Sequence, residues 1–93
     1  MKLIDESTGK TSQGVTLTRV YEHNGHLVQV QVERDDYERQ SHAAARLLAT
    51  GKTWTVLITE PASNWHRQNM LIADVADTLA SRTVRILNAV PGL

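Results

Sequence analysis

The stretch VTLTRVYEHNGHLVQVQVE, residues 15–33, decides the fold, because it holds two alternating segments joined by a turn signal. Apolar and polar side chains alternate on both sides of Asn24-Gly25, which is typical of half-buried β-strands. Asn-Gly is favoured in two-residue type I′ turns, since both central positions need positive φ. We therefore expect an antiparallel hairpin with one apolar face and one polar, solvated face. The register of a two-residue turn sets these residues opposite each other: His23 and His26, Tyr21 and Val28, Arg19 and Val30, and Leu17 and Val32.

The segment 37–50 fits either a helix or a strand. As a helix it would begin after an N-cap at Asp35 or Asp36, continue through the alanines at 43–45 and end at Gly51. As a strand it would join the next strand through a short turn at 50–53. Alanine and arginine favour the helix, whereas the short connection favours the strand, so the sequence leaves both interpretations open.

Two further elements follow. Residues 53–59 are β-branched and apolar, and they predict a strand that Pro61 ends. An apolar repeat of helical period then predicts a helix over residues 63–81, with Ser63 or Asn64 as its N-cap. Residues 82–87 would either extend this helix or return as a strand.

These elements predict an α+β fold, in which an antiparallel sheet of three or four strands carries the C-terminal amphipathic helix on one face. Residues 15–87 would form a single domain, between a flexible N-terminal arm over residues 1–14 and a loose C-terminal tail over residues 88–93. The expected core consists of Leu17, Tyr21, Val28, Val30, Val32, Trp54, Val56, Ile58, Trp65, Ile72, Val75 and Leu79.

Composition narrows the class of protein. A chain of 93 residues has room for one domain. Ten Lys and Arg residues balance ten Asp and Glu residues, so no overall field attracts the chain to nucleic acid or to an anionic membrane. The sequence contains no cysteine and no apolar targeting segment, and we expect a cytoplasmic protein without contact to membranes.

One stretch is locally basic. Residues 39–59 contain no acidic side chain, and they include Arg39, His42, Arg46 and Lys52. On a helix the first three would share one exposed face that could contact phosphates. Spaced charges are more often simply a solvated face, so these four residues are a candidate binding site that requires a test.

The sequence gives little support for a metal site or a nucleotide-binding site. His23 and His26 flank the hairpin turn, but a zinc site needs three or four protein ligands. The triplets at residues 9–11 and 51–53 both read Gly-Lys-Thr, yet neither is preceded by the glycine that a phosphate-binding loop requires. We therefore expect no metal and no cofactor.

The candidate catalytic groups are scattered along the chain. His66 is the best candidate base, because Asn64 or Arg67 could orient it. His42 follows Ser41, but adjacent side chains diverge on a helix and point to opposite faces of a strand. Catalysis needs positioned groups that converge in a pocket. We therefore expect no catalytic residues and no enzymatic activity.

The sequence thus leads to a small non-enzymatic protein-binding or regulatory protein that acts through another protein or through a second copy of itself. A small sheet leaves its edges open, and pairing of these edges would produce a homodimer. The alternative is a nucleic-acid-binding protein that uses the local basic stretch. Binding that weakens steeply with salt would distinguish this alternative.

Overall fold

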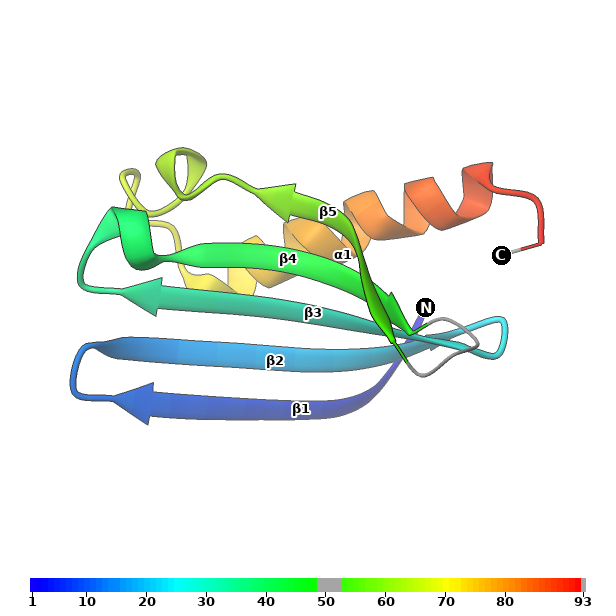
Figure 1. The fold of residues 1–93 in the computed structure, drawn as a ribbon, viewed down its shortest axis with the longest axis horizontal. Helices are drawn as coiled ribbons and strands as arrows, with labels where there is room; N and C mark the ends of the chain where they lie inside the picture. Colours follow the sequence, from blue (N-terminus) through cyan, green and yellow to red (C-terminus); the bar gives the residue numbers. More distant parts are fainter. Residues whose placement is uncertain (49–52, 93) are drawn as a thin grey trace.

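Five antiparallel strands follow one another across a single sheet, in the order β1-β2-β3-β4-β5 (Figure 1). The computed structural model describes residues 1–48 and 53–92. Helix α1 packs on one face of the sheet, and the chain is a small α+β domain, as the sequence predicted, but with five strands where three or four were expected. The elements are β1 (Lys2–Thr11), β2 (Gly14–His23), β3 (His26–Asp35), the 3-10 turn η1 (Glu38–Gln40), β4 (His42–Leu48), β5 (Trp54–Glu60), the 3-10 turn η2 (Ala62–Asn64) and α1 (Ile72–Ala89).

The central hairpin has the predicted turn and register. Asn24 and Gly25 have φ values of 51° and 84°, the left-handed conformation that a type I′ turn requires. His23 pairs with His26, and each of the other predicted pairs is present along β2 and β3. The side chains of Val28, Val30 and Val32 point toward α1 and are fully buried. The opposite face of the sheet carries no described helix, and we call it the uncovered face.

Residues 2–11 form strand β1, so the prediction of a loop or flexible arm over residues 1–14 was wrong for most of this segment. β1 pairs with β2 from Lys2↔Glu22 to Thr11↔Gly14. The strand lies at the edge of the sheet, where every one of its residues is exposed. A strand exposed on both faces needs no apolar alternation, and its polar composition therefore resembled that of a loop.

The ambiguous segment contains a strand. After η1, residues 42–48 form β4, which pairs with β3 on one side and β5 on the other. Ala43 and Ala45 lie on the α1 side with exposures of 2% and 0%. Such small side chains let the residues that pack on this face come close to the sheet. Tertiary packing therefore outweighs the helix propensity of alanine. The turn expected at residues 50–53 lies mostly outside the described residues.

A bulge in β5 reverses the predicted orientation of its first half. Ala45 pairs with Ile58, but the next residue, Arg46, pairs with Val56, so Leu57 is an extra residue in β5. Ile58 packs against the core, while Trp54 and Val56 lie on the uncovered face. The prediction that these two residues belong to the core was wrong, because one inserted residue moves the side chains before it to the other face.

The helix begins later and ends later than predicted. Ser63 and Asn64 belong to η2, and α1 begins at Ile72. Turns separate the two elements, with Asn69 in a left-handed conformation at φ 59°. The helix then continues to Ala89, which settles residues 82–87 as helix and places residues 88 and 89 in α1 rather than in the tail. No helix in the described part of the chain is long and apolar enough to cross a membrane.

The core lies between the sheet and α1. Seven of the twelve predicted core residues are buried, and Tyr21, Ile58 and Ile72 pack partly buried against them. Trp65 is 1% exposed although it precedes the helix. Thr83 is fully buried on α1 and donates a hydrogen bond to the carbonyl oxygen of Leu79 at 2.7 Å. The buried apolar residues are Leu17, Val28, Val30, Val32, Ala43, Ala44, Ala45, Trp65, Val75, Ala76, Leu79 and Leu87.

Candidate functional site

The basic residues that the sequence suggested as a binding site lie in different elements of the structure. Arg39 lies exposed in η1, before the start of β4. His42 and Arg46 lie four residues apart on β4, so both side chains are on the uncovered face. Lys52 lies outside the described residues. The helical face that would have aligned the first three residues is not formed.

Arg46 lies across the middle strands of the uncovered face. Its Nη1 atom donates to the side-chain oxygens of Gln29 and Gln31 at 3.4 Å each. Both acceptors are neutral, so Arg46 retains its full positive charge at this position. Arg46 is the cationic group that the described part of the chain places at the centre of the uncovered face.

His42 is paired with an acidic residue. Its Nε2 atom lies 3.1 Å from Oε2 of Glu33, which is directly opposite His42 in the β3–β4 register. The two side chains are 52% and 43% exposed. The pair lies on the open surface of the sheet and lines neither of the clefts described below. Solvent therefore reaches both side chains of this contact.

Beside Arg46, apolar side chains gather at one end of the uncovered face. The strand register aligns Leu27, Leu48 and Trp54 in one row across β3, β4 and β5. The neighbouring row on the same face contains Val20 and Val56, with Gln29 and Arg46 between them. We call the five apolar residues the apolar corner; they are Val20, Leu27, Leu48, Trp54 and Val56.

The apolar corner presents two prominent side chains to solvent. Trp54 is 37% exposed and Val56 is 52% exposed, whereas the other three members are half-buried among their neighbours. Sequence alternation alone assigned both exposed residues to the core. The bulge at Leu57 places them on the uncovered face, and it is visible only in the pairing of β5 with β4.

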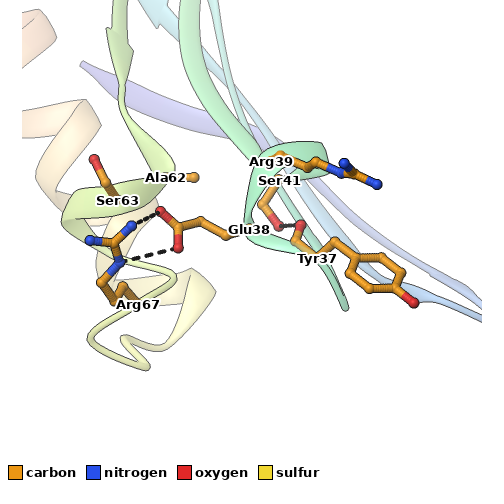
Figure 2. Close-up of a pocket in the computed structure, with 7 residues that line it drawn as sticks. All are labelled: Tyr37, Glu38, Arg39, Ser41, Ala62, Ser63 and Arg67. Atoms are coloured by element: carbon orange, nitrogen blue, oxygen red, sulfur yellow. Dashed lines mark hydrogen bonds and ion pairs between the residues drawn. The ribbon is translucent and has the colours of Figure 1, made fainter.

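A cleft of about 650 Å³ lies between η1 and η2 (Figure 2). Across it, Arg67 forms a two-pronged ion pair with Glu38, at 3.2 Å from Nε and 3.1 Å from Nη2. Figure 2 shows that the side chains of Arg39 and Tyr37 extend away from this ion pair. Glu38 balances the positive charge of Arg67 in the cleft, so Arg67 offers little attraction to an anion.

The side chains of Ser41 and His66, a candidate nucleophile and a candidate base near η1, both form hydrogen bonds with backbone groups. The buried Ser41 hydroxyl accepts from the amide of Asp35 at 2.9 Å and lies 3.1 Å from the carbonyl oxygen of Tyr37. His66 Nε2 lies 2.9 Å from the carbonyl oxygen of Asp35. A carbonyl only accepts, so His66 donates from Nε2. Both side chains secure the turn around residues 35–41.

A second cleft of about 250 Å³ lies where β2 and β3 meet the segment before α1. Arg34 forms part of the wall of this cleft. It donates to Oδ1 of Asn69 at 3.2 Å and to the carbonyl oxygen of Met70. Its guanidinium carbon also lies 5.5 Å from the ring centroid of Trp65, which is a cation–π distance. Arg34 therefore anchors the segment before α1 to the sheet.

Within residues 1–48 and 53–92, no group of three His, Asp or Glu side chains is close enough together to hold a metal ion. His23 and His26 pair across the hairpin as predicted, and no third ligand joins them there. The candidate site is therefore the apolar corner of the uncovered face together with Arg46 beside it. No protein-family model, no curated protein and no solved structure matches the chain.

Proposed function

We propose that the chain is a small non-enzymatic protein-binding protein and that the apolar corner is its binding surface. The observation that carries this proposal is the exposure of Trp54 and Val56 next to each other on one face of a sheet. Tryptophan is enriched among the residues that contribute most to protein–protein binding. An exposed apolar patch with a polar rim is also typical of such interfaces.

The charges around the apolar corner indicate the chemistry of the partner. Arg46 lies between Val56 and Gln29 and would pair with a carboxylate at the centre of the interface. The partner is therefore a protein surface with apolar side chains around one carboxylate. The outer part of the uncovered face carries four acidic side chains and one lysine, Lys2, and this excess of negative charge favours a protein over the phosphates of a nucleic acid. The acidic residues on this face are Asp5, Glu22, Glu33 and Asp35.

The placement of the histidines supports a non-enzymatic role. His42 and Glu33 form an exposed pair outside any described cleft. His66 is committed to the carbonyl oxygen of Asp35. General acid–base catalysis depends on a base that reaches the substrate within a pocket.

The proposal is tested by photo-crosslinking in cells of the source organism. A photoreactive amino acid is introduced at Val56 in one variant and at Leu71, which is 69% exposed beside α1, in the control. We expect one protein to cross-link from position 56 and not from position 71, and the purified form of that protein to bind the wild-type chain. Nucleic acid cross-linked from position 56 would instead support the basic-stretch alternative, and no position-dependent cross-link would overturn the proposal.

A further inference from the structure

Strand β1 leaves one long edge of the sheet open. β1 pairs only with β2, and all ten of its residues are exposed. The opposite edge, β5, has seven residues and a bulge at Leu57, and Trp65 Nε1 donates to the carbonyl oxygen of its last residue, Glu60, at 3.2 Å. Bulges and covering side chains obstruct the pairing of an edge with another strand. β1 is therefore the edge at which a further strand can be added.

The bulge-free part of β1 comprises residues 5–11, because the register shift lies between Leu3 and Asp5. At the other end, Thr11 lies opposite Gly14 across a two-residue turn, and the pair that closes such a turn is as a rule a hydrogen-bonded pair. Hydrogen-bonded and non-hydrogen-bonded pairs alternate along an antiparallel ladder. The amide and carbonyl groups of every second residue therefore point away from β2. These residues are Glu6, Thr8 and Lys10.

This outward set is symmetric about Thr8, and its charges are complementary to themselves. If a second copy lies antiparallel with Thr8 opposite Thr8, Glu6 of each copy, which also pairs with Arg19 of its own chain, faces Lys10 of the other. Opposite charges and Thr–Thr pairs stabilise neighbouring antiparallel strands. A register centred on Glu6 would instead set Glu6 against Glu6 and Lys2 against Lys10, which is repulsive.

We propose that a second copy of this chain pairs with residues 5–11 of β1, antiparallel and about a two-fold axis at Thr8. The pairing joins two five-stranded sheets into one continuous sheet with about six added backbone hydrogen bonds. This inference goes beyond the proposed function, because it concerns the edge of the sheet and leaves the apolar corner accessible. The small contact area predicts a weak dimer that forms as the concentration rises.

The charge pattern is tested by sedimentation equilibrium over a range of concentrations. Lys10→Glu turns both Glu–Lys contacts into Glu–Glu contacts, so we expect the dissociation constant to rise roughly tenfold. Lys2→Glu makes the same change of net charge outside residues 5–11 and should leave the dissociation constant within about twofold. A monomeric wild-type chain at millimolar concentration, or equal effects of the two substitutions, would overturn the proposal.

The register is tested by disulfide formation, since the chain has no cysteine of its own. Residues opposite each other in a hydrogen-bonded pair have Cα atoms about 5.5 Å apart, which is within the range of a disulfide. Thr8→Cys should therefore form a disulfide-linked dimer under mild oxidation. Thr11→Cys should not, because each Thr11 would lie opposite Asp5 and roughly 20 Å from the other Thr11. Equal rates for the two variants would contradict the two-fold axis at Thr8.

The two proposals fail independently. The apolar corner is not part of the β1 edge, so Val56→Asp should leave the mass distribution in sedimentation unchanged, whereas Lys10→Glu should leave cross-linking from position 56 unchanged. If Val56→Asp abolished the dimer, the second copy would occupy the uncovered face, and the β1 assignment would be wrong.

Discussion

Arg19 donates a hydrogen bond from Nη1 to Oδ1 of Asp77 at 2.6 Å, and this contact joins β2 to α1. The same guanidinium pairs with Glu6 on β1 at 3.3 Å. Burial alone would lower the pKa of Arg19. Its hydrogen bonds to Asp77 and Tyr21 raise the pKa by more than burial lowers it, so the pKa lies above its usual value. A cationic group whose pKa is raised in the folded state contributes its full stability at any pH below its pKa in the unfolded state. This contribution is lost only as the pH rises above that value. Arg19 itself therefore stays charged throughout the neutral range.

Replacing Arg19 should loosen the attachment of the helix to the sheet. We expect Arg19→Met to lower the free energy of unfolding by about 1 to 2 kcal/mol, because it leaves Asp77 and Glu6 without their cation. Urea denaturation should give the same loss at about pH 6 and about pH 8, since Arg19 is protonated at both. Arg85→Met, at an exposed position of α1, serves as the control and should stay within about 0.5 kcal/mol of the wild type. A loss that disappeared at the higher pH would contradict this role of Arg19.

The covered and uncovered faces should respond differently to the same truncation. Val30 is 0% exposed beneath α1, so Val30→Ala should lower the free energy of unfolding by about 2 to 3 kcal/mol. Val56 is 52% exposed, and Val56→Ala should cost less than about 0.5 kcal/mol. Denaturant midpoints measure both effects. Equal midpoints for the two variants would mean that the sheet faces are assigned incorrectly.

Two glycines of the β1–β2 hairpin should differ in their tolerance of a methyl group. A Cβ atom on Gly14 would overlap the backbone carbonyl oxygen of Arg34, whereas on Gly9 its nearest neighbour would be Cβ of Thr16 at 3.9 Å. We expect Gly14→Ala to cost about 1 to 3 kcal/mol because the backbone must shift. Gly9→Ala should be nearly neutral in thermal unfolding. A stable Gly14→Ala variant would show that β2 and β3 are not so close at this end.

Tryptophan fluorescence reports the bulge in β5 directly. Trp54 is 37% exposed and Trp65 is 1% exposed, so a neutral quencher such as acrylamide should act almost entirely on Trp54. Trp54→Phe should therefore leave emission that resists quenching, whereas Trp65→Phe should leave emission that is readily quenched. If both single-tryptophan variants were quenched equally, Trp54 would lie on the α1 side, as alternation without a bulge would place it.

The hairpin could be predicted from sequence because its determinants are local. Asn24-Gly25 defines the turn, and period-two alternation on both sides fixes which residues face the core. β1 has neither signal: its side chains are exposed on both faces, and only its pairing with β2 makes it a strand. β4 was undecided for a related reason, since its alanines suit a helix locally and are selected here by the packing of the core over Ala43 and Ala45.

The candidate site was missed because a single extra residue decides it. Leu57 shifts the register of β5 and brings Trp54 and Val56 to the uncovered face, and no composition signal marks this bulge. The helix start was misplaced in a similar way. Trp65 and Ile72 fit one apolar repeat, but the left-handed Asn69 interrupts the helix between them. The basic stretch was visible in the sequence, yet its strand conformation separates Arg39 from Arg46.

The affinity of the purified cross-linked partner for the apolar corner tests the proposed function most directly. Titration calorimetry would compare the wild type with Val56→Asp and with Leu71→Asp, which makes the same change of charge away from the uncovered face. Val56→Thr, which keeps the β-branched shape, checks that any loss is not due to unfolding. We predict that Val56→Asp weakens binding at least about tenfold, that Val56→Thr weakens it less, and that Leu71→Asp leaves it unchanged. Equal affinities for Val56→Asp and the wild type would contradict the assignment of the apolar corner as the binding surface.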